Sequence, residues 1–255
     1  MTVKRQDIII DEDKIALNYR EGTSKPGLMW VGGYMSDMGG TKAVYVDEWA
    51  KKHNQAALRF DYSGHGQSGG DFYKGNISIW LKQALVVFDA FTKGPQILLG
   101  SSMGGWIVLR MAQELKKHNI KLAGIILMAP APDFTETLVK PNLTKEHHDL
   151  LNTQGFFTVK TPYGEEPYSK ALIDDGMNNI VMNGLIDVDC PVTILQGMKD
   201  EEVPYHHTLQ LMQHMPLNDV TLTLIHDGDH RLSRPQDLLL LDQALTRMSE
   251  PFKAK

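Results

Sequence analysis

Short apolar runs alternate with longer segments of helical period along most of this chain, and this alternation constrains the fold more than any other feature. From the third run onward, the runs are nearly continuous in Leu, Ile, Val and Met. Strands without a polar side are typical of a parallel sheet that helices cover on both faces. The predicted strands are Asp7–Ile10, Lys14–Arg20, Leu28–Val31, Ala56–Asp61, Ile97–Gly100, Leu122–Met128, Val192–Gln196 and Val220–His226.

Segments of helical period fill the intervals between these runs. The first two runs are joined by only a few residues, too few for a crossover helix, so they are predicted to pair as an antiparallel hairpin at the sheet edge. The fold class is therefore predicted to be α/β, with a mostly parallel eight-stranded sheet and helices on both faces. The predicted helices are Thr41–His53, Ile77–Thr92, Met103–His118, Pro204–His214 and Pro235–Met248.

The alternation breaks once, between residues 131 and 189. This stretch contains several prolines and scattered apolar residues, and it is too long for a bare loop. We interpret it as an inserted cap that lies over one end of the sheet, partly helical near Thr144–Leu151 and Ser169–Met182. The predicted domains are a core formed by residues 1–130 and 190–255, and a cap formed by residues 131–189.

The composition excludes several classes of protein. With 42% apolar residues, 22% charged residues and the single cysteine Cys190, the chain is neither disordered nor a disulfide scaffold. Its 26 basic residues are scattered and outnumbered by 31 acidic ones, so no nucleic-acid partner is expected. No cofactor or metal is expected either. Because no signal peptide and no apolar run of membrane-spanning length is present, the predicted location is cytoplasmic.

The strongest chemical signal is the sequence Gly100-Ser101-Ser102-Met103-Gly104, which follows a predicted strand and precedes a predicted helix. A G-x-S-x-G sequence in this context is typical of a nucleophile elbow, where the serine sits on a strained turn and its neighbours must be small. The helix also directs its first amides at the serine, which favours developing negative charge. Ser102 is therefore the predicted nucleophile, with Gly100 and Gly104 as the elbow glycines.

A serine nucleophile needs a base, and the base needs an orienting acid. Functional groups of a parallel sheet gather beyond the carboxyl ends of its strands, and two later strands end near Asp200 and His230. The order serine, acid, histidine is the order expected when the nucleophile lies on such an elbow. We therefore predict that His230 is the base and Asp200 the acid. The rivals are Glu201 and Glu202 for the acid and His226 for the base.

The tetrahedral intermediate of acyl transfer also needs two donors for its oxyanion. One is the amide of Met103, directly after the nucleophile. The other is expected from the loop after the third predicted strand, where Gly32 and Gly33 allow the backbone to turn toward the substrate. The amide of Tyr34 is the predicted second donor.

Taken together, these motifs resemble those of the alpha/beta-hydrolases across nearly the full length of the chain. Within that superfamily, two stretches resemble the mitochondrial palmitoyl-protein thioesterase family, whose members also cleave acyl glucuronides. These stretches are residues 33–38 with 40–43, and residues 59–66. The superfamily markers are Gly32-Gly33-Tyr34, Asp61-Tyr62-Ser63-Gly64-His65-Gly66-Gln67-Ser68, the Ser102 elbow, Asp200 and His230.

The resemblance implies hydrolysis of acyl thioesters and esters, with a small acyl ester or an S-acylated protein as substrate. The chain begins only a few residues before its first predicted strand, so we expect a bacterial or cytosolic relative without a transit peptide. Three alternatives stay open: another carboxylesterase, a peptidase or carbon–carbon hydrolase of the same fold, and a ligand receptor that does not turn its ligand over.

Overall fold

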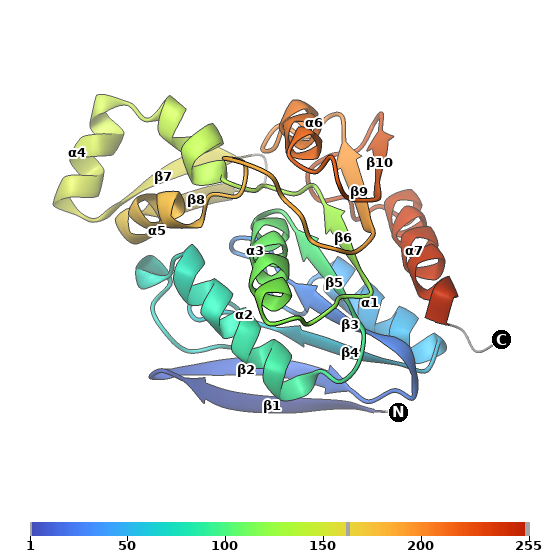
Figure 1. Cartoon of the computed structure of the whole chain (residues 1–255). Coiled ribbons are helices and arrows are strands. Elements are labelled where there is room, and N and C mark those ends of the chain that lie inside the picture. Colours follow the sequence, from blue (N-terminus) through green and yellow to red (C-terminus); the bar gives the residue numbers. More distant parts are fainter. Residues whose placement is uncertain (1, 162–163, 253–255) are drawn as a thin grey trace.

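The computed structural model describes residues 2–161 and 164–252, and within them one eight-stranded sheet dominates the molecule (Figure 1). The α/β class and the eight-stranded sheet predicted from the sequence are confirmed. The strand order is β1-β2-β4-β3-β5-β6-β9-β10. The strands are β1 Val3–Ile10, β2 Asp13–Arg20, β3 Ser24–Val31, β4 Gln55–Phe60, β5 Gln96–Ser101, β6 Gly124–Met128, β9 Val192–Gly197 and β10 Val220–Ile225.

Strand directions in this sheet follow the lengths of the connections. β1 and β2 form the predicted antiparallel edge hairpin, with Val3 opposite Arg20 and Ile10 opposite Asp13. β2 is also antiparallel to β4, and every further pair from β4 to β10 is parallel. β1 begins four residues before the predicted strand. An edge strand has a solvent-facing side, so its backbone hydrogen bonds to β2 continue through polar residues that show no apolar pattern in the sequence.

Helices cover both faces of the sheet, as the apolar strands require. α1 (Thr41–Lys52) and α7 (Pro235–Ser249) pack on one face, while α2 (Ile77–Phe91), α3 (Met103–Lys117) and α6 (Tyr205–Gln213) pack on the other. Strand β3 shows the principle: Met29 and Val31 belong to the core under α2 and α3, whereas Leu28 and Trp30 belong to the core under α1 and α7. Each face of the strand is therefore buried against helices.

The segment between β6 and β9 forms a separate layer of small elements at one end of the sheet, at the upper left of Figure 1. Helices occur near both places where they are predicted, but the strands β7 and β8 pair as an antiparallel hairpin that the sequence pattern did not indicate. The division into core and cap domains stays a prediction. The elements are the π-helix Thr135–Val139, the 3₁₀-helix Lys140–Asn142, α4 Lys145–Thr153, β7 Phe156–Thr161, β8 Gly164–Ser169, α5 Lys170–Asp175 and the 3₁₀-helix Gly176–Asn179.

Specific hydrogen bonds fasten this inserted segment to the rest of the chain. The buried carboxylate of Asp133 accepts from the amides of Val181, at 2.9 Å, and Met182, at 2.7 Å, which joins the two ends of the segment. The carboxylate of Asp175 accepts from the amide and the hydroxyl of Ser78, at 2.8 and 2.7 Å, which ties α5 to the start of α2. The segment is thus anchored by polar contacts as well as by packing.

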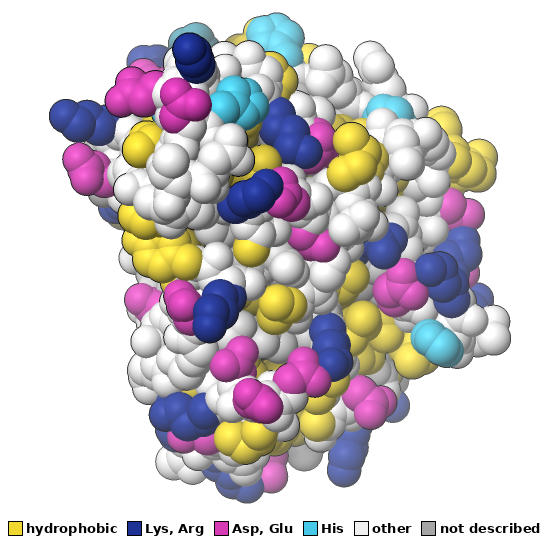
Figure 2. Space-filling model, turned by 90° about the vertical axis from the view of Figure 1, so that its left-hand side faces the viewer, with side chains coloured by type: hydrophobic (Ala, Val, Ile, Leu, Met, Phe, Trp, Pro, Cys, Tyr) yellow, Lys and Arg dark blue, Asp and Glu magenta, His cyan; other side chains and the backbone are white. Residues whose placement is uncertain are grey.

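The exposed surface mixes both signs of charge. Figure 2 shows Lys and Arg side chains interspersed with Asp and Glu over the face that it presents. In the part of the chain that the structure describes, no helix is both long enough and apolar enough to cross a membrane.

Candidate active site

Ser102 stands at the junction between β5, which ends at Ser101, and α3, which begins at Met103. Its backbone has φ 54° and ψ −123°, a conformation that a residue with a side chain rarely adopts. Such strain costs about 1–3 kcal/mol and persists only where the surrounding structure enforces it. Here β5 on one side and α3 on the other hold Ser102 in this conformation. The turn therefore has the shape of the predicted elbow.

The two elbow glycines are required by close backbone approach. A Cβ atom at Gly100 would overlap the carbonyl of Gly104, and a Cβ atom at Gly104 would overlap the carbonyls of Val31 and Gly32. Both obstacles are main chain and cannot move aside. The glycines therefore let β5, α3 and the loop after β3 meet around Ser102.

The structure brings Asp200 and His230 together, although thirty residues separate them. Nδ1 of His230 lies 2.8 Å from Oδ2 of Asp200, whose side chain is fully buried. The other oxygen of Asp200 accepts from the amides of Glu202, at 3.0 Å, and Val203, at 2.8 Å. Because a carboxylate only accepts hydrogen bonds, the neutral form of His230 carries its proton on Nδ1 and leaves Nε2 free to accept one.

Gln196 is a site residue that sequence reasoning missed. Its fully buried amide donates to Oδ2 of Asp200 at 3.1 Å and to the carbonyl of Val203 at 3.1 Å, while its own oxygen accepts from Thr208 at 2.7 Å. Gln196 therefore fixes Asp200 and its loop in one orientation. The available signal was a polar residue inside an otherwise apolar strand, which a buried strand rarely carries without a partner.

Charge around His230 favours its protonated form. Burial by itself would lower the pKa of His230, but the hydrogen bond and charge of Asp200, together with the charge of Glu202, outweigh burial and raise it. Nearby Lys42 opposes this effect. The imidazolium that forms when His230 accepts a proton is thereby stabilised.

The two segments that carry the predicted oxyanion donors both lie next to Ser102. The amide of Met103 belongs to the first turn of α3, where amides have no partner within the helix. The backbone of Gly33 runs beside the elbow, since a Cβ atom there would lie 3.3 Å from Cβ of Ser102. The amide of Tyr34 follows directly, so both predicted donors belong to segments that border Ser102.

Comparison with known proteins gives the family. Residues 25–158 match the family model described as "Serine aminopeptidase, S33", which is just over half of the chain. The chain belongs to the alpha/beta-hydrolases. It is 36% identical over 219 residues to the rat protein named "Palmitoyl-protein thioesterase ABHD10, mitochondrial", covering 85% of this chain and 72% of the relative. The human protein of the same name is 33% identical over 236 residues, covering 91% and 75%.

Solved structures agree with this assignment. A putative hydrolase from Agrobacterium vitis matches this hydrolase with a TM-score of 0.94 and 46% identity, covering 97% of this chain and 99% of that chain. The mouse alpha/beta hydrolase domain-containing protein 10 matches with a TM-score of 0.86 and 31% identity, covering 98% and 100%. The protein is an enzyme of the hydrolase class, as its motifs predict.

The comparisons overturn one expectation. The sequence analysis predicts a cytoplasmic protein, but the curated relatives are named as mitochondrial, and the prediction is wrong on that finding. The physical reason is that location depends on an address read by a receptor, whereas composition and fold are shared by hydrolases of any compartment.

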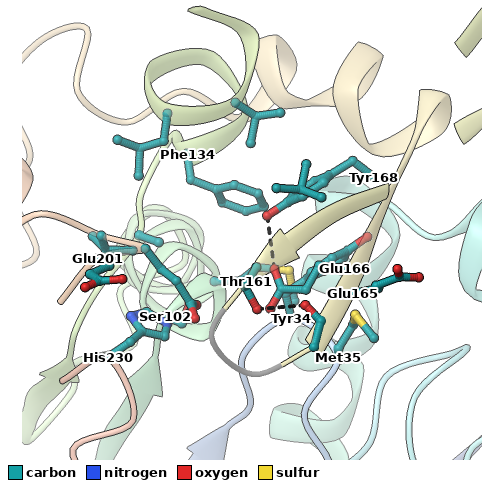
Figure 3. Close-up of a pocket in the computed structure, with 18 of the residues that line it drawn as sticks. Tyr34, Met35, Ser102, Phe134, Thr161, Glu165, Glu166, Tyr168, Glu201 and His230 are labelled. Atoms are coloured by element: carbon teal, nitrogen blue, oxygen red, sulfur yellow. Dashed lines mark hydrogen bonds and ion pairs between the residues drawn. The ribbon is translucent and has the colours of Figure 1, made fainter. Parts of the chain in front are cut away.

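The candidate active site of this hydrolase opens into a cavity of about 650 Å³. Figure 3 shows Ser102 and His230 beside each other at one side of it, with Phe134 and Tyr168 facing the cavity from the inserted segment. An apolar wall comes from the same segment and is formed by Phe134, Leu138, Val139, Leu143, Phe157 and Val159. Charged groups line other parts of the cavity: Lys42, Lys160, Arg231, Glu165, Glu166, Glu201 and Glu202.

Lys42 is another residue to which the sequence motifs assign no role, and it lines the cavity. Burial lowers its pKa to about 8 despite nearby carboxylates, and its amine donates to the carbonyl of Arg231 next to His230. By contrast, the rival base His226 is exposed after β10 and does not line the cavity. Among the described residues, no group of three His, Cys, Asp or Glu side chains is arranged to hold a metal ion.

Proposed function

We propose that this hydrolase cleaves acyl thioesters and esters through an acyl-enzyme formed on Ser102. The observation that carries the proposal is the hydrogen bond between His230 and the buried Asp200, at a cavity that also contains the strained Ser102. An activated serine, an oriented base and an amide pair next to them are the parts that acyl transfer requires.

In the proposed mechanism, Nε2 of His230 takes the proton of Ser102 while Oγ attacks the carbonyl carbon. Asp200 holds the imidazole through Nδ1 and stabilises its charge, and the amides of Tyr34 and Met103 receive the oxyanion. The intermediate collapses, the bond to the leaving sulfur or oxygen breaks, and His230 returns the proton to that atom. Water then repeats the attack on the acyl-enzyme, which releases the carboxylic acid and restores Ser102.

Two considerations support the proposed substrate class: how easily the leaving group departs, and the apolar wall of the cavity. A thiol has a pKa near 8.5, so a thiolate leaves with less help from a general acid than an amine needs. The six apolar side chains of the inserted segment offer a surface for an acyl chain. With relatives named as palmitoyl-protein thioesterases, we propose S-acylated proteins or small acyl thioesters as substrates, with acyl glucuronides as the ester counterpart.

The test is steady-state hydrolysis of matched thioesters and oxoesters from acetyl to palmitoyl, with Ser102→Ala as the blank. Serine-dependent turnover that rises with chain length is the expected result. Equal turnover by wild type and Ser102→Ala would refute the mechanism. Labelling of Ser102 without multiple turnover would instead indicate a receptor, because labelling reports an activated serine and turnover reports catalysis.

One observation favours a second candidate, an aminopeptidase. Glu165 and Glu166 line the cavity, and carboxylates at that place are able to pair with the ammonium group of a peptide N-terminus. Hydrolysis of aminoacyl p-nitroanilides, compared with their N-acetylated forms, distinguishes the two. A free-amine substrate cleaved faster than the best thioester would replace the thioesterase proposal.

A further inference from the structure

Glu202 lies against the catalytic face of the proposed base. Its Oε2 is 3.4 Å from Nε2 of His230, which is the ring atom that must take the proton of Ser102. Both side chains are shielded from water, with 20% of Glu202 and 12% of His230 exposed. Within the described parts of the chain, the second oxygen of Glu202 is buried and has no hydrogen-bond partner.

A buried carboxylate with one unpaired oxygen is costly unless a cation stands beside it. Nε2 of His230 is able to supply that cation by binding a proton directed at Oε2. His230 and Glu202 then share one proton. The surroundings decide whether the pair exists as imidazolium and carboxylate or as neutral imidazole and carboxylic acid. While the proton lies between the two groups, Nε2 is not available to Ser102.

Other charged groups also face this pair. His230 is influenced by Asp200 of its own triad and by Lys42 at the start of α1. The pKa of Glu202 is raised by burial first and then by Glu166 and Asp200, while His230 and Arg231 lower it. The balance around Glu202 therefore leaves its charge dependent on the proton of His230.

We propose that Glu202 is a positioning residue that holds the protonated His230 in the resting enzyme and so sets the pH below which the hydrolase is inactive. The inference rests on the proposed function, because it assumes that neutral His230 is the working base. Protonated His230 is stabilised by Glu202, so activity should begin at a higher pH than Asp200 alone would produce.

A structural role of Glu202 in the loop of Asp200 can be distinguished from the proposed effect of its side chain on His230. The contact of Glu202 with the acid loop is made by its backbone amide, which donates to Oδ1 of Asp200 at 3.0 Å. That bond survives any substitution of the side chain except proline. Glu201 provides a matched control, since it is the adjacent glutamate and lines the same cavity, whereas the ion pairs of His230 among the described residues are with Asp200 and Glu202.

The first experiment is a pH profile of kcat/KM for one activated ester, each variant normalised to its own plateau. Glu202→Gln should move the acid-side midpoint downward by about one pH unit. Relative activity below the wild-type midpoint then rises up to about tenfold. Glu202→Asp, which keeps the charge, should return the midpoint toward wild type, and Glu201→Gln should leave it unchanged. A midpoint that Glu202→Gln does not move, or that Glu201→Gln moves equally, overturns the inference.

The second experiment needs no turnover and separates this inference from the proposed function. His230 is titrated by NMR in Ser102→Ala, with its signal assigned by loss in Ser102→Ala/His230→Gln. The pKa of His230 should be lower in Ser102→Ala/Glu202→Gln than in Ser102→Ala. Equal values refute the role of Glu202 even if the triad stands, whereas turnover by Ser102→Ala refutes the proposed function whatever the titration gives.

Discussion

The eight-stranded sheet with its helices and the inserted segment differ in how they are packed. Helices cover both faces of the central strands, and Leu98 of β5 is fully buried in the core on one of these faces. In the described residues, the inserted segment combines a two-stranded hairpin and short helices with a small cluster of its own, formed by Leu151, Phe157 and Ile173. The rigid part carries Ser102, Asp200 and His230, and the smaller part supplies the apolar wall that faces them. The candidate catalytic residues and the apolar wall therefore lie on regions that are packed differently.

The largest expected effect concerns the rigid part. Ser102→Ala should lower kcat by at least about a thousandfold, because the substitution removes the hydroxyl of the proposed nucleophile. Its melting temperature should stay close to that of wild type, since the small change removes no buried contact. Ester turnover and thermal unfolding measure the two quantities. If Ser102→Ala loses its fold together with its activity, the loss of activity would no longer support Ser102 as the nucleophile.

Asp200→Asn should lower kcat by up to about 10⁴, because an amide at this position no longer selects the tautomer of His230 that frees Nε2. Glu201→Gln is the matched control and should have little effect on kcat. If Glu201→Gln is the inactive variant and Asp200→Asn is active, the rival glutamate is the acid. Steady-state kinetics at the plateau pH decides between them.

A matched pair of leucines tests the difference in packing directly. Leu98→Ala in the sheet should cost about 3–5 kcal/mol, while Leu151→Ala in the inserted segment should cost about 2 kcal/mol, because a small cluster relaxes around the deletion more readily. Denaturant unfolding measures both. Equal losses would contradict the view that the inserted segment is the more loosely packed region.

The raised pKa of His230 predicts how stability depends on pH. A group whose folded pKa exceeds its unfolded value, near 6.5, stabilises the folded state most below that pH. The contribution is lost as the pH rises through the folded pKa. The difference in unfolding free energy between wild type and His230→Gln should therefore be largest below the unfolded pKa of histidine. It should shrink as the pH rises through the folded pKa of His230. A difference that grows with pH would show that the surroundings of His230 disfavour its charge.

The smallest expected effect concerns the contact between the two regions. The hydroxyl of Tyr34 donates to the carbonyl of Pro167 in β8, so Tyr34→Phe should cost about 1 kcal/mol while leaving the backbone amide in place. Amide exchange in β8 should become faster, and KM for long acyl chains should rise more than kcat falls. Unchanged exchange in β8 would mean that packing, rather than this bond, holds the hairpin.

Much of the rigid part could be predicted from the sequence because its signals are local. Apolar runs mark the strands, and the glycines around Ser102 mark the turn at which β5 meets α3. The hairpin of β7 and β8 was missed because its second strand, Gly164–Ser169, carries glutamates and a proline and is largely only half-buried or exposed, so it shows no apolar run. The roles of Ser102, Asp200 and His230 stay predictions that the geometry is consistent with.

By itself, the sequence determined the fold class and marked the candidate residues for acyl transfer, since burial periodicity and small residues at a turn act over a few neighbours. Only the tertiary structure decided that Gln196 holds Asp200 and that Glu202 faces Nε2 of His230. It also decided that residues 134–159 supply the apolar side of the cavity. These contacts join segments that are distant along the chain, and their distances are set by packing that no local pattern encodes.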